Sequence, residues 1–147
     1  MKNNFFSKIF WIFILFALLP FKSNAEQFNF KVSEIEILNN GNLFKGLNRG
    51  IIETDNGLII EANKFVYDKL QNILNASGEV KVNDTINKYN IFSDKITYKK
   101  NEEVIFSTGN SKAVDNNQKI IKADNFTYNK NLDILNAKKN VVVEDGI

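Results

Sequence analysis

Residues 59–84, IIEANKFVYDKLQNILNASGEVKVND, return later in the chain as residues 120–145, IIKADNFTYNKNLDILNAKKNVVVED. The two segments are identical at 13 of 26 positions, whereas unrelated segments of ordinary composition would match at about two. Residues 89–114 form a third copy between them, so that one tyrosine position recurs as Tyr67, Tyr98 and Tyr128, at steps of 31 and 30 residues. A fixed period of this length is typical of stacked supersecondary units, none of which buries its apolar face alone.

Each copy has the side-chain pattern of β-strands. Apolar residues alternate at period two, for example at Ile60 and Ala62 and again at Val80 and Val82, and no stretch shows a helical stripe. Turn-forming clusters separate the apolar runs at residues 40–41, 56–57, 69–72, 83–84, 99–102, 115–118 and 129–133. The sequence predicts an all-β fold, a single antiparallel sheet of 30-residue repeats, in which residues 28–54 form an irregular first unit.

The composition of the 147-residue chain excludes several chemistries. The chain has no cysteine and no histidine, and its single proline, Pro20, precedes the repeats. Zinc sites, thiol redox centres and hydrolases with a histidine base therefore cannot be assembled from it. Hydrophobic residues make up 44% and charged residues 24%, which is typical of a globular domain. We expect a protein that is not an enzyme and that needs no metal or other cofactor.

The first 25 residues have the three parts of a secretory signal peptide. Lys2 and Lys8 form a basic start, 11 apolar residues follow at 9–19, and Ser23-Asn24-Ala25 is a small-residue cleavage site. A retained membrane anchor is the alternative, but the apolar run is shorter than the roughly 18 residues that span a bilayer. We predict cleavage after Ala25, which leaves residues 26–147 as the exported domain.

Cleavage also changes the charge of the protein. It removes three lysines and no acid from the 19 basic and 17 acidic residues, so the exported domain carries 16 basic and 17 acidic side chains and a net charge of −1. Arg49 is its only arginine. Such a chain lacks the basic stripe that binds a phosphate backbone, and nucleic acid is not an expected partner.

Three polar residues recur once per repeat, Asn63, Asp94 and Asp124. A spacing of one full repeat, with asparagine in place of one aspartate, favours side chains that cap a bend by hydrogen bonding to the backbone. A calcium site would need several oxygen ligands converging in one loop. We therefore assign these residues to the fold and not to metal binding.

The end of the repeat array is predicted to pair with another strand. Val141, Val142 and Val143 form an apolar last strand, and no proline protects either edge of the sheet. The chain ends at Gly146-Ile147, where the period would begin another strand. Either another subunit continues the sheet there, or the chain is the front portion of a longer protein.

The repeated pattern Ile-Ile-x-Ala-Asp/Asn-x-Phe-x-Tyr, followed by Ile-Leu-x-Ala-x-Gly-x-Val-x-Val, resembles the OstA-like domain of the lipopolysaccharide-transport proteins LptA and LptD. The resemblance covers about residues 28–147. It implies a single antiparallel sheet folded over on itself, an open β-jelly roll or β-taco. It also implies a periplasmic transport module whose apolar interior holds the acyl chains of lipid A. The implied partners are lipopolysaccharide, and other Lpt-type β-jelly-roll proteins or the protein itself, joined head to tail through end strands.

The match to this family has departures. Asn63 stands where the other copies have aspartate, and Lys138-Lys139 replaces Ser-Gly in the last copy. The short length favours an LptA-like protein. The abrupt end favours the front domain of an LptD-like protein, which a following barrel would attach to the outer membrane.

Alternate residues of the strands are expected to line the apolar groove. A buried methylene contributes about 0.8 kcal/mol, so long acyl chains bind there without a polar pocket. The predicted lipid-binding residues are Ile60, Ala62, Phe65, Tyr67, Leu74, Val80, Val82, Ile91, Ile96, Tyr98, Ile105, Ile121, Phe126, Tyr128, Leu135, Val141 and Val143. The alternative function is an exported structural β-solenoid or interaction protein without lipid cargo, in which the same residues are only core.

Overall fold

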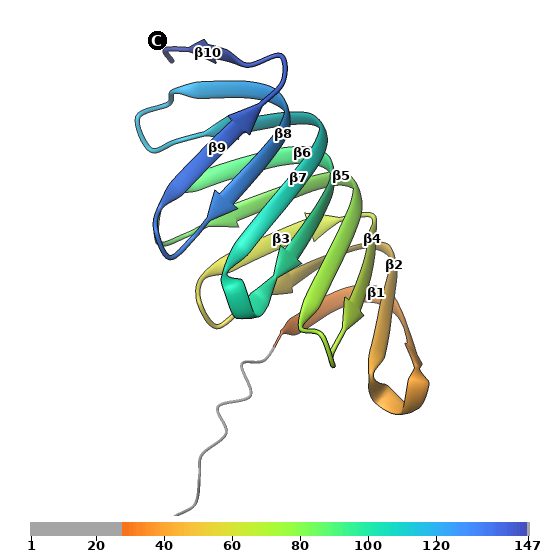
Figure 1. The fold of residues 1–147 in the computed structure, drawn as a ribbon. Helices are drawn as coiled ribbons and strands as arrows, with labels where there is room; N and C mark the ends of the chain where they lie inside the picture. The colour runs from red at the N-terminus through yellow and green to blue at the C-terminus, as the bar shows by residue number, and fades with distance from the viewer. Residues whose placement is uncertain (1–27, 147) are drawn as a thin grey trace, which may run out of the picture.

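The computed structural model describes residues 28–146, which form one antiparallel sheet of ten strands (Figure 1). The strands are β1 (Asn29–Leu38), β2 (Leu43–Glu53), β3 (Leu58–Ala62), β4 (Lys64–Asp68), β5 (Ile73–Asp84), β6 (Tyr89–Lys99), β7 (Val104–Val114), β8 (Ile120–Asn129), β9 (Ile134–Lys138) and β10 (Val142–Glu144). Two short 3-10 turns, η1 (Asn39–Gly41) and η2 (Lys100–Glu102), connect strands. The predicted signal peptide, residues 1–25, lies outside the described residues. Within residues 28–146, no helix has the length and hydropathy to cross a membrane.

The sheet follows the repeats in order, β1-β2-β3-β5-β6-β7-β8-β10. β3 and β4 pair with the same two neighbours, β2 and β5, so they are one strand interrupted at Asn63. β9 and β10 likewise pair with the two halves of β8. The predicted all-β fold of a single antiparallel repeat sheet is confirmed. Several boundaries were wrong by one or two residues. The last strand starts at Val142 instead of Val141, and the turn after β5 occupies residues 85–88, not 83–84. Lys99 and Asn129, predicted in turns, are the last residues of β6 and β8.

The sheet folds over along a line that we call the corner. On the strands that carry Asn63, Asp94 and Asp124, the alternation of buried side chains shifts by one residue at that position. Buried Ala62 is followed by buried Phe65, three residues later instead of two. The shift keeps the apolar side chains on the concave side after the backbone has turned.

The strands between them bend at the corner in a different way, through a β-bulge. Each has two successive residues in the left-handed region: Asn48-Arg49 (φ 62° and 57°), Gly78-Glu79 (79° and 50°), Gly109-Asn110 (81° and 47°) and Lys139-Asn140 (65° and 49°). The pairing register skips these two residues, as at the bulge between Thr108 and Ser111. Such bulges bend a strand sharply, and repeating them in register folds the whole sheet.

Glycine is required at Gly109 for two reasons. Its φ of 81° is strained for other residues, and a Cβ there would lie 2.5 Å from Asp94 Oδ2. Lys139 occupies the equivalent place in the last repeat at φ 65°, where a side chain costs about 1 kcal/mol or more.

Gly109→Ala is expected to lower the free energy of unfolding by about 1–3 kcal/mol, because it adds both backbone strain and a close contact. The matched change Lys139→Gly removes strain, and it should leave stability equal or raise it by up to about 1 kcal/mol. Urea unfolding of both variants is the measurement. A tolerated Gly109→Ala would mean that the corner does not depend on left-handed geometry.

Candidate functional site

The concave side of the sheet carries two continuous rows of apolar side chains. In each row, directly paired residues run from strand to strand across all the repeats. The first row is Phe30, Ile52, Ile60, Val82, Ile91, Ala113, Ile121 and Val143. The second row is Ile37, Phe44, Tyr67, Leu74, Tyr98, Ile105, Tyr128 and Leu135. Together they make an apolar interior that runs the length of the stack.

The predicted lipid-binding residues lie mainly in this interior. Thirteen of them are buried: Ile60, Ala62, Phe65, Tyr67, Leu74, Val80, Val82, Ile91, Ile96, Tyr98, Ile105, Phe126 and Tyr128. Ile121 and Leu135 are partly buried and pack against that core. Val141 and Val143 are 48% and 57% exposed at the β10 end. Whether any of them touches lipid stays a prediction.

Sequence reasoning missed part of the core. Ile52, Leu58, Ala76 and Ala113 are buried but were not predicted. Ala76 lies two residues after Leu74, so the period-two alternation already contained the signal. Phe28 is also buried, at 7% exposure, and precedes the first strand, where no periodicity exists to indicate it.

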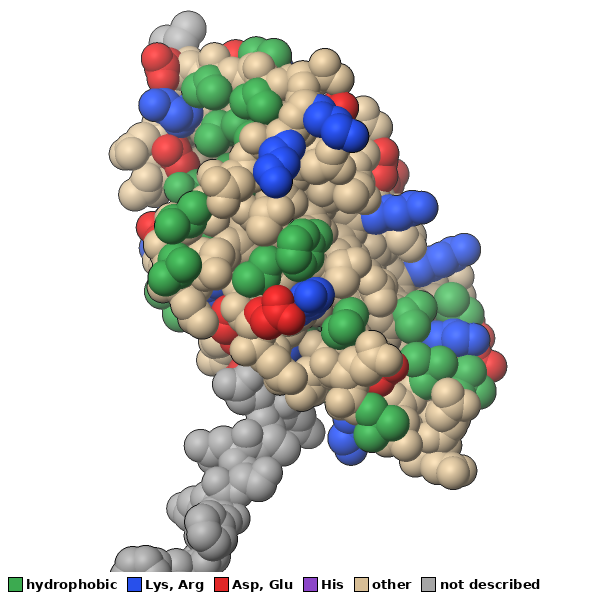
Figure 2. All heavy atoms as spheres, in the orientation of Figure 1, with side chains coloured by type: hydrophobic (Ala, Val, Ile, Leu, Met, Phe, Trp, Pro, Cys, Tyr) green, Lys and Arg blue, Asp and Glu red, His purple; other side chains and the backbone are tan. Residues whose placement is uncertain are grey.

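The interior is closed in the middle of the stack and exposed at both ends. Tyr98 and Tyr128 have no exposed surface, whereas Ile37, at the start of their row, is 56% exposed. Ile35 on the same edge strand is 43% exposed, and Val143 ends the other row at 57%. Figure 2 shows hydrophobic side chains gathered around the β1–β2 end and around the β10 end. The apolar rows are therefore continuous with two exposed apolar ends.

The recurring residues at the corner connect neighbouring strands. Asp94 Oδ2 accepts a hydrogen bond from Asn110 Nδ2 at 2.9 Å, and Asn63 Oδ1 accepts one from Arg49 Nη1 at 3.3 Å. Their predicted place at a bend is correct. Their side chains, however, bind side chains of a neighbouring strand, and not the backbone as we expected. Among the described residues, no group of three acidic side chains is placed to hold a metal ion.

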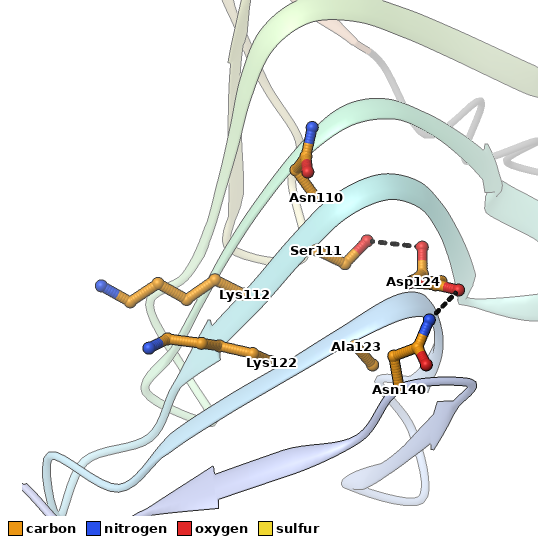
Figure 3. Close-up of a pocket in the computed structure, with 7 residues that line it drawn as sticks. All are labelled: Asn110, Ser111, Lys112, Lys122, Ala123, Asp124 and Asn140. Carbon is orange, nitrogen blue, oxygen red and sulfur yellow. Dashed lines mark hydrogen bonds between the residues drawn. The ribbon is translucent and has the colours of Figure 1, made fainter.

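Figure 3 shows the same arrangement around Asp124, in a pocket between β7, β8 and the segment before β10. Asn140 Nδ2 donates to Asp124 Oδ2 at 3.0 Å, and Ser111 Oγ donates to the Asp124 backbone oxygen at 3.4 Å. Lys112 and Lys122 are directly paired across the strands and extend side by side away from the corner. Lys122 also binds Glu144 Oε1 at 2.7 Å, so this surface is not strongly basic.

Opposite the corner, the two long margins of the folded sheet meet along a line that we call the seam. One margin includes turn 54–57 and turn 85–88 with Asp84 at the end of β5, and the other includes turns 100–103 and 130–133. Asn56 Nδ2 reaches across the seam to Tyr98 Oη at 3.0 Å and to Glu103 Oε2 at 2.5 Å. Tyr98 Oη donates to the same Glu103 oxygen at 2.9 Å. We call this group the first clasp.

A second clasp crosses the seam one repeat later. Tyr128 Oη donates to Asp84 Oδ2 at 2.7 Å, and Asn87 Nδ2 donates to Tyr128 Oη and to the Lys130 backbone oxygen, both at 2.9 Å. Asp84 and Lys130 are 1% and 8% exposed, with 4.0 Å between Lys130 Nζ and Asp84 Oδ2. Asp84, predicted as a turn residue, is thus a buried acid whose carboxylate is satisfied from both margins.

Lys100 is the repeat equivalent of Lys130 and is also buried, at 2% exposure. Its Nζ lies 3.7 Å from Asp55 Oδ1 across the seam and 4.6 Å from the centre of the Phe28 ring. Phe28 also packs edge-on against Tyr67, with 4.5 Å between ring centroids. The Phe28 ring is therefore buried against Lys100 and Tyr67, beside the first clasp.

Comparison with known proteins bears on the fold. No protein-family model matches this chain, and no curated protein matches it in sequence. The fold is that of LptH. LptH is the LptA-homologous periplasmic component of the conserved lipopolysaccharide-transport device of Pseudomonas aeruginosa. The two structures align with a TM-score of 0.73 over 83% of this chain and 96% of that one, at 10% sequence identity. At this identity, the likeness to LptH establishes the shared architecture.

Burial controls the ionisation of the seam tyrosines. Desolvation raises the pKa of Tyr128 far above its ordinary value, and the neighbouring Asp84 carboxylate adds to the rise. Burial likewise raises the pKa of Tyr67 and of Tyr89. The phenol of Tyr128 therefore stays neutral and keeps donating its hydrogen bond to Asp84.

Raising the pH above about 10 should destabilise the fold. The unfolded chain loses its phenol protons there while folded Tyr128 keeps its own, so the folded state binds more protons. The free energy of unfolding then falls with pH, by up to about 1.4 kcal/mol per pH unit for each retained proton.

Tyr128→Phe removes one such proton and should make the fall shallower. Urea unfolding between about pH 8 and about pH 11 measures both slopes. Equal slopes for the two proteins would contradict the assignment of this pH dependence to Tyr128.

Proposed function

We propose that this protein is a periplasmic lipopolysaccharide-binding transport module of the LptA or LptD type, acting in outer-membrane assembly. The observation that supports it best is the pair of apolar rows, which run through the folded sheet and stay exposed at both ends. The fold shared with LptH supports the same assignment. The signal peptide predicted at residues 1–25 would direct the domain to the periplasm.

The proposed cargo contact is between lipid A acyl chains and the two rows. Each methylene transferred from water to such an interior contributes about 0.8 kcal/mol, so affinity grows with chain length. The lining is aliphatic and aromatic, with few polar groups that would fix one ligand position. An interior of this kind holds a long apolar chain and also lets it move along the stack.

End-strand pairing is the second part of the proposal. β1 and the β9–β10 strand are the two edges of the described sheet, and each leaves one side unpaired within it. Val141, Val142 and Val143 are 48%, 49% and 57% exposed at one edge. A second module of the same fold added there would continue both the hydrogen-bonded sheet and the apolar rows. An LptA-like protein and the N-terminal domain of an LptD-like protein, attached to the outer membrane, both fit this arrangement.

A photocrosslinking residue at Phe126 is expected to capture lipopolysaccharide in cells. The Phe126 side chain is 2% exposed and faces the interior, whereas Thr127 is directed to the outer side of the same strand. The matched Thr127 variant should therefore give little or no lipid adduct. Immunodetection of the crosslinked species with an antibody against lipopolysaccharide is the measurement.

Absence of an adduct at both positions, in a protein that is folded and exported, would contradict lipid carriage. The interior would then be core alone, and the protein would be a structural β-solenoid or interaction protein.

Replacing Val141 and Val143 with lysine is expected to weaken end-to-end association. Both positions are about half exposed, so the monomer tolerates the charge, whereas a paired neighbour would bury it. Leu70→Lys, at a 77% exposed turn position away from both edges, is the control. Sedimentation should show a mass that rises with concentration for the parent and the control, and a constant mass for the double variant. A parent protein that stays monomeric at all concentrations would exclude self-pairing.

A further inference from the structure

We infer that the two clasps form a gate that decides whether an amphiphile reaches the interior from the side. This inference rests on the proposed function, because it concerns how cargo enters the same apolar rows. The gate residues are Asn56, Tyr98 and Glu103 in the first clasp, and Asp84, Asn87 and Tyr128 in the second. None of them was predicted from sequence to act at the seam.

The clasps repeat with the fold. Tyr98 and Tyr128 are separated by 30 residues, and so are the buried Lys100 and Lys130. Each tyrosine hydroxyl binds a group on the opposite margin, 42 and 44 residues away in sequence. Tyr67, at the same place in the first repeat, instead donates to Asn72 on its own margin at 2.9 Å. Of these three tyrosine hydroxyls, those of Tyr98 and Tyr128 therefore bond across the seam, whereas that of Tyr67 bonds within its own margin.

An amphiphile has a polar head group and an apolar chain, and this explains why the two margins must separate to admit it. A polar head group keeps its hydration, and drawing it through an interior lined by Ile, Leu, Val and Tyr would strip that hydration without replacement. The chain must lie inside while the head lies outside, so the molecule spans the seam. The hydrogen bonds of Asn56 and Asn87 across this line occupy the space that such a ligand needs.

Hydrogen bonds between the margins suit a gate, because hydrogen bonds to water can replace them when the seam opens. When the margins separate, Asp84 and Asn87 on one margin and Tyr128 and Lys130 on the other regain water as the bonds between the margins break, so the net cost of breaking these polar contacts is small. A seam closed by apolar contacts would lose burial on opening and gain nothing from water. The interior thus stays covered without cargo and opens locally without unfolding the sheet.

Opening can be tested without ligand, because the chain has no cysteine. Ala113→Cys places a thiol in the first row at a position that is 1% exposed. Its rate of reaction with the polar disulfide reagent DTNB reports access of solvent to the interior. Adding Tyr128→Phe should raise this rate at least about fivefold in native buffer. The rate should change little when low concentrations of urea are added, because local opening exposes little surface.

Tyr67→Phe is the matched control, since it deletes the same hydroxyl at the equivalent repeat position but breaks no cross-seam bond. It should leave the DTNB rate unchanged. Equal rates for both phenylalanine variants, or a rise that appears only with global unfolding, would overturn the gate.

Ligand passage is tested by closing the seam covalently. A short bismaleimide joins cysteines in Asn56→Cys/Glu103→Cys, whose native side chains meet across the seam at 2.5 Å. Linking should slow the uptake of fluorescent lipopolysaccharide at least about tenfold relative to the unlinked variant. The control pair is Asn72→Cys/Asn101→Cys, whose side chains meet at 3.0 Å within one margin, and linking it should not slow uptake.

The two proposals fail in different ways. Parent protein that takes up no lipopolysaccharide contradicts the proposed function, and the DTNB rates still decide whether the clasps govern opening. Uptake by the parent that continues unchanged in the linked cross-seam variant overturns the gate and assigns access to the exposed ends.

Discussion

A single sheet with one apolar face has no second layer to cover that face, and the fold depends on how the sheet closes over itself. Closure is achieved at the corner, where paired left-handed residues such as Gly109-Asn110 alternate with single-residue phase shifts such as that at Asp94. The two devices lie opposite one another and are joined by the Asn110–Asp94 hydrogen bond. Because each strand bends at the same place in the repeat, the bends align into one line instead of twisting the sheet apart.

Once the sheet has folded, its two faces and its two margins acquire different chemistry. The concave face becomes apolar and buried in the middle of the stack, as the fully buried Tyr98 and Tyr128 rings show. The margins are made of turns, whose backbone and side chains are polar, so they meet through hydrogen bonds such as that of Tyr128 to Asp84. A buried acid and a buried lysine are costly in isolation, but at the seam each lies beside the opposite charge, and Asp84 also accepts hydrogen bonds. The apolar interior therefore supplies stability, while the polar seam is the place where we propose that the structure opens.

The ends of the stack follow from the same geometry. Every inner strand covers its neighbours, whereas the edge strands have a neighbour on one side only, which leaves Ile37 and Val143 about half exposed. Apolar rows that end in solvent favour a further strand at each end, and the proposed neighbouring module of the same fold would supply one. The proposed lipid carriage, end-strand pairing and gated seam are compatible with one another, because each uses a different part of the same folded sheet: its interior, its ends and its seam.

The sequence by itself determined the repeat, the strands and most of the inward residues. Alternation at period two is a local property of a strand, so residues such as Ile60, Leu74 and Phe126 could be assigned to the interior without coordinates. The recurring Asn63, Asp94 and Asp124 likewise marked the bend, because turn chemistry repeats with the fold. Tertiary structure alone decided which margins meet. Asn56 and Glu103 are 47 residues apart, a separation that is not a multiple of the repeat, and only the folding of the sheet brings them together. Burial of Asp84, and exposure of Val141 and Val143, depend equally on neighbours across the seam or beyond the edge, which no local pattern contains.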